Sequence, residues 1–146
     1  MDRKVRCQGI ILKDGCILIL KQYNYRRKEE YWMLPGGGLE NNETEEECIK
    51  REIEEETNLA VDIIEVLFDD NREGSDVYKR YVTFLCIPKK DSVEKIGTEM
   101  VSYRKILELV WCPLDDEGKW NDNIKREQFF PSMKRIKDKL ISMGVI

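Results

Sequence analysis

Three glutamates in the middle of the chain are spaced so that one face of a helix would carry all of them. Glu52, Glu55 and Glu56 follow the pattern i, i+3, i+4, which groups side chains on neighbouring helical turns. In bulk water their repulsion would be screened and modest, whereas at the edge of a core the carboxylates would need compensation. Hard divalent cations prefer carboxylate and carbonyl oxygens. The spacing therefore indicates Mg²⁺ or Mn²⁺ among these carboxylates.

The residues around the three glutamates suit hydrolysis of a phosphoric anhydride. Arg51 can reach Glu55 at i+4 and hold it at a fixed angle. A predicted turn at Gly36, Gly37 and Gly38 leaves backbone near the site without side chains, so its carbonyls can ligate a metal and its amides can approach phosphate. A metal there would neutralise phosphate charge and lower the pKa of a bound water, while a glutamate accepts the proton.

An acidic run on a helix is ordinarily a solvated face, and glutamates near a helix start also favour its dipole. We assign Glu45, Glu46 and Glu47 to that class. Glu52, Glu55 and Glu56 differ, because they belong to a longer pattern.

That pattern resembles the Nudix box, G-x5-E-x7-R-E-U-x-E-E-x-G-U, in which U is aliphatic. The resemblance to the Nudix hydrolase family (MutT-like) extends over the whole chain, and the lead-in Trp32–Gly37 is also typical of the family. Asn58 replaces the usual glycine, and Asn42 stands where relatives commonly have another; asparagine tolerates positive φ, so we expect both turns to survive. The matching positions are Gly37, Glu43, Arg51, Glu52, Ile53, Glu55, Glu56 and Leu59.

The resemblance implies a role for each of these residues. Glu52 and Glu56 would ligate Mg²⁺ or Mn²⁺, joined by Glu55 and by the carbonyl of Gly36. Arg51 would orient the glutamates, and Glu43 would brace the loop that Gly37 opens against the helix. Family members differ over the general base, and some use a glutamate outside the box. Glu99 is the first candidate for this base and Glu94 the second, although each is also explained as surface charge.

The implied activity is metal-dependent hydrolysis of a nucleoside diphosphate linked to another moiety, such as a nucleoside triphosphate or a nucleotide sugar. The competing interpretation is a catalytically inactive Nudix fold that senses a ligand or binds a partner. Action on RNA ends would need a basic track, and only Arg26, Arg27, Lys28 and the last helix offer cations for one. No substrate-binding residue can be chosen. Homodimers occur in the family, but no segment demands one.

Composition excludes several other kinds of chemistry. The chain has 146 residues, which suits one domain over residues 1–146, and a formal charge of −4, which argues against a nucleic-acid groove. It has no histidine, which excludes Ser-His-Asp and Cys-His catalysis and makes a zinc site implausible. Five scattered cysteines fit a cytoplasmic, reducing compartment. The N-terminus lacks an apolar signal region, and no run could span a bilayer.

Periodicity predicts an α/β fold in which strands surround one acidic helix. A capping box at Thr44 and Glu47 starts this helix, which we expect over about 44–57, and Asn58 ends it. Apolar spacings of three and four predict a C-terminal helix over about 129–143. Together with the resemblance, this predicts a Nudix-like α/β/α sandwich with a mixed central sheet and one helix on each side. Strands are expected at 5–12, 16–20, 60–68, 77–87 and 103–111, the last of which would also tolerate a helix.

Overall fold

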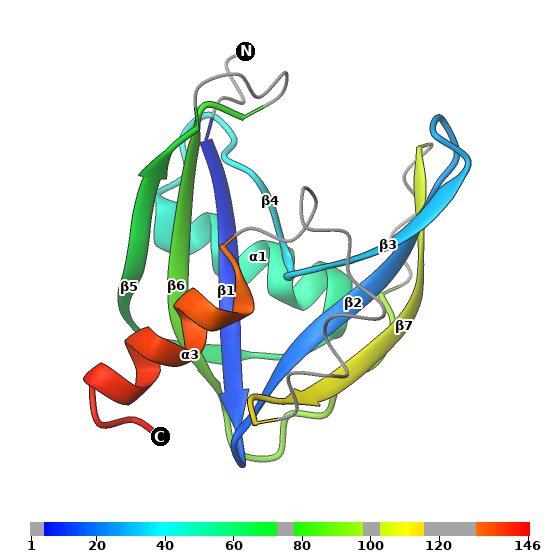
Figure 1. Ribbon diagram of the computed structural model, residues 1–146. Helices are drawn as coiled ribbons and strands as arrows, with labels where there is room; N and C mark the ends of the chain where they lie inside the picture. The colour runs from blue at the N-terminus through cyan, green and yellow to red at the C-terminus, as the bar shows by residue number, and fades with distance from the viewer. Residues whose placement is uncertain (1–4, 73–77, 98–102, 116–130) are drawn as a thin grey trace.

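The computed structural model describes residues 5–72, 78–97, 103–115 and 131–146, and these contain seven strands and two helices (Figure 1). Neither helix has the length and apolarity needed to cross a bilayer. In chain order the elements are β1 (Val5–Lys13), β2 (Cys16–Asn24), β3 (Glu29–Met33), β4 (Gly36–Gly38), α1 (Glu45–Thr57), β5 (Val61–Asn71), β6 (Arg80–Pro88), β7 (Arg104–Pro113) and α3 (Met133–Ser142).

The strands form one mixed sheet with β1 at its centre. The main order is β3-β2-β1-β6-β5, with β4 also paired to β1 and β7 also paired to β2. Only the β1–β6 pair is parallel among the described strands. The last residues of β1, Leu12 and Lys13, pair with β2, whereas 5–11 pair with β6 and 6–8 also pair with β4. The sheet therefore divides into two lobes, and β2, β3 and β7 diverge as an arm from β1, β5 and β6 (Figure 1).

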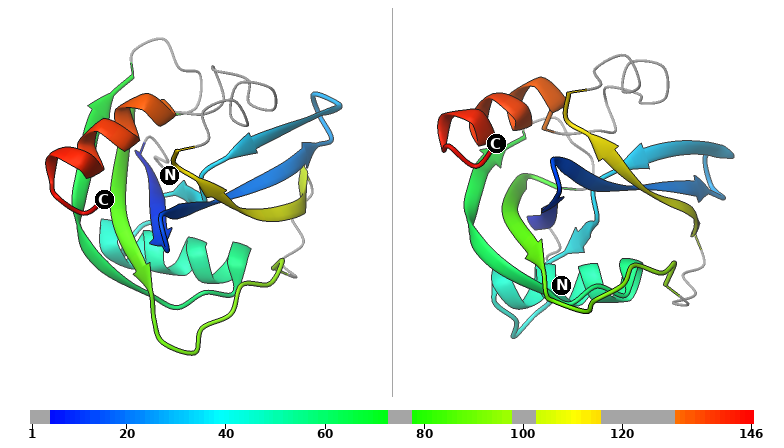
Figure 2. Two further views of the ribbon diagram at one scale, coloured as in Figure 1. Left: turned by 60° about the horizontal axis from the view of Figure 1, so that its bottom comes forward. Right: turned by 90° about the horizontal axis from the view of Figure 1, so that it is seen from below.

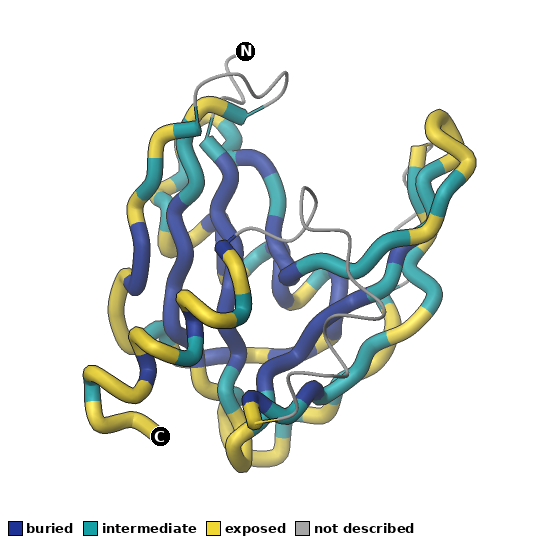
Figure 3. The backbone as a smooth tube through the Cα atoms, in the orientation of Figure 1, coloured by how far each residue is buried: buried dark blue, intermediate teal, exposed yellow. Residues whose placement is uncertain are grey.

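Alternation along β1 directs its side chains into two separate cores, one on each face of the sheet. Ile10 packs in the core that contains Ile136 and Leu140 of α3. Ile11, on the opposite face, packs in the core that contains Ile49 and Ile53 of α1. Figure 2 shows α1 and α3 on opposite sides of the sheet, and Figure 3 shows that the buried backbone runs along the central strands. The predicted α/β/α sandwich with a mixed sheet is confirmed.

Both ends of α1 have the caps that the sequence predicts. The Thr44 side chain accepts from the Glu47 N–H at 3.1 Å, and the Glu47 carboxylate accepts from the Thr44 N–H at 2.9 Å. Asn58 ends the helix in the left-handed conformation, with φ 65° and ψ 4°. The helix therefore occupies Glu45–Thr57, as expected.

The segment after β6 closes the C-terminal end of α1. The N–H of Lys95 donates to the Thr57 carbonyl at 2.8 Å, and the N–H of Gly97 donates to the Glu56 carbonyl at 3.0 Å. The Asn58 side chain donates to the Val93 carbonyl at 3.2 Å. The bonds from Lys95 and Gly97 satisfy carbonyls that a helix end otherwise leaves unpaired. The last turn of α1, which carries Glu55 and Glu56, is thus held by a segment some forty residues away in the sequence.

Three predictions about the strands are corrected by the structure. The glycine stretch is not a turn but the short strand β4, because Gly36–Gly38 pairs with Arg6–Gln8 of β1. The strand expected at 16–20 continues to Asn24, because Gln22, Tyr23 and Asn24 pair with β3 and β7. Strand β5 continues past Phe68 to Asn71, where ladder bonds to β6 outweigh the polar character of the residues. The strand alternative for residues 103–111 is confirmed, since β7 occupies Arg104–Pro113.

The C-terminal helix begins later than predicted. Helix α3 starts at Met133, where the Ser132 side chain accepts from the Arg135 N–H at 3.3 Å as the N-cap. Pro131 therefore precedes the helix rather than starting it, and positions 129 and 130 lie outside the described residues. The predicted apolar face is confirmed at Ile136 and Leu140, both fully buried.

The left-handed cap at Asn58 predicts a distinct response to substitution. Replacing Asn58 with alanine should destabilise the protein by about 1 kcal/mol, because a Cβ without a local hydrogen-bonding group is strained at positive φ. The Asn58→Gly variant loses the same bond to Val93 but relieves the strain, so it should stay within about 0.5 kcal/mol of the parent. Urea unfolding of the three proteins measures the difference. Equal loss in both variants would show that the bond, not the backbone conformation, matters.

Candidate active site

The acidic face of α1, which we define as Glu52, Glu55 and Glu56, lies at the edge of the core. Ile49 and Ile53, on the adjoining side of the helix, are fully buried against the sheet. Glu52 is 9% exposed and Glu56 only 1%, whereas the Glu55 side chain is 33% exposed. Burying a carboxylate is unfavourable unless it is paired or hydrogen-bonded. The acidic face is therefore not a solvated helix surface, and its partners decide what it can do.

Arg51 bonds three nearby carboxylates, which belong to Glu43, Glu52 and Glu55. Its Nη1 donates to Glu52 Oε1 at 2.8 Å and to Glu55 Oε2 at 3.3 Å. Its Nε and Nη2 donate to the two oxygens of Glu43 at 3.0 and 2.8 Å. A planar guanidinium bonded by this two-point fork cannot turn freely. Arg51 thus fixes the direction of two acidic-face carboxylates from a support outside the helix.

Glu43 is that support, and it also braces the loop before α1. Its carboxylate accepts from the Glu40 N–H at 2.9 Å, in addition to both bonds from Arg51. The Arg51 guanidinium, opposed in part by burial, lowers the pKa of Glu43 from 4.5 to about 2. Asn42, just before it, has φ 66°, the left-handed conformation that asparagine tolerates. The loop from β4 to α1 is consequently anchored to the helix by charge.

Strand β4 brings bare backbone against the acidic face. The Gly36 N–H donates to Glu56 Oε1 at 2.8 Å. The Gly9 N–H donates to the Pro35 carbonyl, so the adjacent residues Gly36 and Gln8 face each other as a non-hydrogen-bonded pair. The backbone N–H and C=O of Gly36 therefore both point away from β1. A Cβ at Gly37 would lie 2.4 Å from Glu52 Cδ, closer than real contacts allow. Glycine is therefore required here to let the Glu52 carboxylate reach the strand.

Glu56 has a second partner that comes from the other lobe of the sheet. Arg104, at the start of β7, donates through Nη2 to Glu56 Oε2 at 2.6 Å and through Nη1 to Gln22 Oε1 at 3.0 Å. Burial raises the pKa of Glu56 to about 7, although Arg104 opposes this. One buried carboxylate thus joins α1, β4 and β7.

Sequence reasoning did not identify Arg104 or its neighbour Gln22. Their bonds join residues 48 and 82 positions apart, so no local spacing could have indicated them. It also did not identify Arg6, which is 8% exposed and whose Nη2 donates to the Leu34 carbonyl at 3.0 Å. Arg6 therefore holds the segment that leads into β4. Charged or amide residues at alternating strand positions, among apolar ones, were the available signal.

The donor set fits a hard divalent cation. Three carboxylates on one helical face, two of them buried, lie beside the backbone of Gly36, whose carbonyl faces the same edge of β4 as its N–H. No three acidic, histidine or cysteine side chains of the described residues converge on one point. Arg51 and Arg104 bond the carboxylate oxygens and so supply the compensating positive charge in this structure.

The two predicted glutamates outside the box differ in what can be said of them. Glu99 lies outside the described residues. Glu94 accepts from Trp111 Nε1 at 2.9 Å, and this bond lowers the pKa of Glu94. Glu94 thus has a structural partner on β7.

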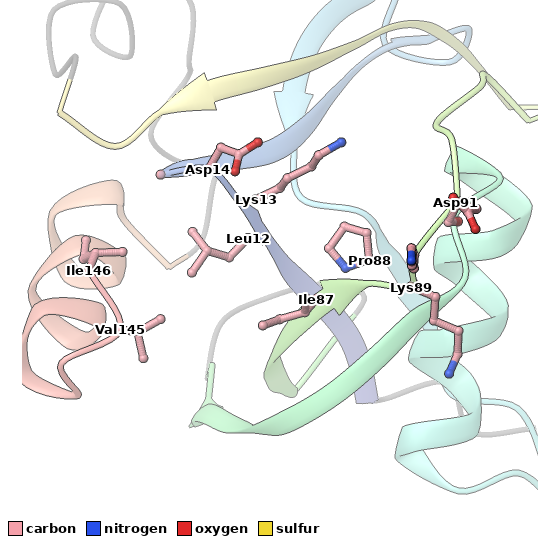
Figure 4. A pocket seen from close by; sticks show the side chains of 12 residues that line it. Leu12, Lys13, Asp14, Ile87, Pro88, Lys89, Asp91, Val145 and Ile146 are labelled. Carbon is pink, nitrogen blue, oxygen red and sulfur yellow. The ribbon is translucent and has the colours of Figure 1, made fainter.

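A cavity of about 500 Å³ lies elsewhere, between the β1–β2 turn, the end of β6 and the last two residues (Figure 4). Lys13, Pro88 and Ile146 are among its lining residues, and the acidic face contributes none. Lys13 lies over the Trp111 ring and Lys89 bonds Asp62 at 2.7 Å, so two of its cations have partners. This cavity is separate from the candidate active site.

Comparisons with known proteins agree with this geometry. Residues 3–133 match the profile of the NUDIX domain. Nucleoside triphosphatase NudI of Escherichia coli O17:K52:H18 is 32% identical over 114 residues, which cover 70% of this chain and 79% of that protein. The RNA pyrophosphohydrolase of Dinoroseobacter shibae is 36% identical over 62 residues, 42% of this chain and 39% of its own length, so the matched part spans about two fifths of that relative.

A solved structure has the same fold at low sequence identity. The crystal structure of an ADP-ribose pyrophosphatase from Streptococcus suis superimposes with a TM-score of 0.68 at 17% identity, covering 97% of this chain and 92% of that one. The match to the domain profile covers most of the chain and includes the whole acidic face with its glycine strand. The chain therefore belongs to the Nudix family.

Proposed function

We propose that this chain is a pyrophosphohydrolase that uses Mg²⁺ or Mn²⁺ to hydrolyse a nucleoside diphosphate linked to another moiety. The observation that carries the proposal is the burial of Glu52 and Glu56 against side-chain-free backbone at Gly36 and Gly37. Two buried carboxylates at a glycine edge are unfavourable as mere structure. They are favourable where a cation and a phosphate chain must meet the same surface.

Each residue of the site has a defined task in this reaction. Glu52, Glu55, Glu56 and the Gly36 carbonyl would hold the cation, which supplies charge neutralisation at the phosphates and acidifies a water molecule. Arg51 keeps Glu52 and Glu55 aimed, through its anchor on Glu43. The general base is a glutamate of the acidic face or Glu99. Gly97, two residues before Glu99, donates to the backbone of Glu56, which favours keeping Glu99 as a candidate.

Nucleoside triphosphates are the first substrates to test. The E. coli relative that this chain matches over most of its length is named a nucleoside triphosphatase. Nucleotide sugars, ADP-ribose and dinucleoside polyphosphates complete the panel. Nucleic acid is a poorer candidate, since the chain has a formal charge of −4. A homodimer is compatible with the fold, although no described contact requires one.

We assign the protein to the cytoplasm and treat residues 1–146 as one domain. All five cysteines are free thiols, which suits a reducing compartment. Both cores share the strand β1, so the two lobes depend on each other. The competing function, an inactive Nudix fold that binds a ligand or partner, would not need the fixed carboxylate geometry around Arg51.

Removing one carboxylate charge should abolish hydrolysis. Glu55→Gln and Glu56→Gln should each lower kcat by about 100-fold or more in a Mg²⁺-dependent assay over the substrate panel, because a ligand and possible proton acceptor is lost. Glu54→Gln, on the exposed side of the same helix, is the matched control and should keep full activity. Parent protein that binds no Mn²⁺ and hydrolyses no panel member would favour the binding module instead.

The Glu43–Arg51 pair should stabilise the fold in a pH-dependent way. At pH 7, Glu43→Gln should cost about 2 kcal/mol, since it removes a charge-assisted two-point bond. The folded pKa of Glu43, about 2, lies below its ordinary value of 4.5, so this stabilisation is full above pH 4.5 and is lost as pH falls toward 2. Urea unfolding at pH 7 and pH 3 should show the parent–variant gap narrowing. A gap that stays constant would contradict the assignment.

The close approach of β4 to Glu52 predicts a steric effect. Gly37→Ala should push the Glu52 carboxylate away, because the new Cβ would lie 2.4 Å from Glu52 Cδ. Mn²⁺ affinity, measured by electron paramagnetic resonance, should fall by about tenfold or more, as for a displaced ligand or supporting group. Pairing the change with Glu52→Asp, which shortens the side chain, should recover part of the affinity. Unchanged affinity in Gly37→Ala would show that Glu52 does not depend on this approach.

A further inference from the structure

Arg104 is a buried cation of the site, and only two single hydrogen bonds to described residues hold its guanidinium. Its side chain is 10% exposed and is held by two single bonds, one to Glu56 and one to Gln22. Its Nε is buried, and no described residue accepts from it. An arginine has a fork of donors suited to two oxygens of one phosphate or carboxylate. The Nε–H is therefore a donor already inside the site without an acceptor among the described residues.

The contrast with Arg51 shows which arginine can move. Arg51 has the two-point bond to Glu43, which lies outside the acidic face and is itself anchored by the Glu40 N–H. Arg104 has Glu56 as its one anionic partner among the described residues. Gln22, its neutral partner, is held in turn by the Tyr31 hydroxyl at 2.5 Å. If the Arg104–Glu56 ion pair opened, Arg104 would thus stay near the site but lack an anionic partner among the described residues.

Each oxygen of Glu56 already accepts one hydrogen bond, so a cation that binds this carboxylate would compete with the present donors for its charge. Oε1 accepts from the Gly36 N–H, which is fixed in a strand, and Oε2 accepts from Arg104, which is a side chain. The Arg104 contact is the one that can open without breaking the sheet. A guanidinium beside a newly bound dication is also repelled by it. A substrate phosphate is the anion that would then lie within the same site.

We propose that Arg104 is a substrate-positioning residue, which pairs with Glu56 in the metal-free protein and transfers to a phosphate of the substrate when a divalent cation binds Glu56. The inference rests on the proposed function in taking a phosphoric anhydride as the substrate. It gives a role to the buried Nε–H, which bonds no residue that the structure describes: this donor and a released Nη would complete a two-point grip on phosphate. Arg104 also makes substrate binding depend on prior metal binding.

Nuclear magnetic resonance of the arginine side chains tests the transfer directly. Whole protein labelled with ¹⁵N at arginine is titrated with Mg²⁺ and then, at saturating Mg²⁺, with inorganic pyrophosphate. The Arg104 guanidinium signal, identified by its absence in Arg104→Lys, should shift or broaden with Mg²⁺ and move again with pyrophosphate. Arg80, which pairs with Glu45 and Asp69 away from the site, is the internal control and should not respond. An Arg104 signal unmoved by both additions would show a merely structural ion pair.

A binding measurement tests the second half of the proposal. Arg104→Gln should weaken Mg²⁺-dependent binding of pyrophosphate about tenfold or more in calorimetry, as for a lost charged hydrogen bond. Arg80→Gln, the matched control, should bind as the parent does. In steady-state assays Arg104→Gln should raise KM more than it lowers kcat. Parent-like pyrophosphate affinity in folded Arg104→Gln would overturn the proposal.

These outcomes separate the inference from the proposed function. If the parent hydrolyses no panel member while the Arg104 signal still moves with Mg²⁺ and pyrophosphate, the proposed activity fails and the transfer stands. If the protein hydrolyses a substrate but the Arg104 signal moves with neither Mg²⁺ nor pyrophosphate, the proposed activity stands and the transfer is refuted. The spectra use the unmodified protein, so a variant that folds poorly does not affect this result.

Discussion

The structure depends on one constraint, namely that two carboxylates of α1 are buried at the edge of a hydrophobic core. The helix is held to the sheet by Ile49 and Ile53, and the same rotation turns Glu52 and Glu56 inward. Such a placement is stable only with compensating charge and hydrogen bonds. Strand β4 and the two arginines supply these, so much of the site exists to make this burial tolerable.

The compensation comes from two different sources. Arg51 is on the helix itself and is anchored by Glu43 in the preceding loop, so this half of the site forms within one continuous stretch. Arg104 comes from β7, in the arm formed by β2, β3 and β7 (Figure 1). Helix α1 is therefore where the two lobes of the sheet meet chemically.

Most of the fold followed from local patterns, and the errors have a common cause. The capping box, the left-handed Asn58 and the first strand, expected at 5–12, depend on short-range features, and each was predicted correctly. Strand β4 was predicted as a turn, because three glycines lack strand propensity, and only pairing with β1 extends them. The ends of β2 and β5 were likewise set by partner strands rather than by their own polar residues.

By itself, the sequence determined the family, and it predicted the half of the candidate site that lies within one stretch, from Gly37 to Leu59. Spacing along a helix fixes which carboxylates share a face, so the grouping of Glu52, Glu55 and Glu56 can be predicted from their positions in the sequence alone. Only the tertiary structure decided how deeply Glu52 and Glu56 are buried, and that Arg104 bonds both Gln22 and Glu56. Burial and contacts across 48 or more positions depend on how strands pair, which no local pattern of residues contains.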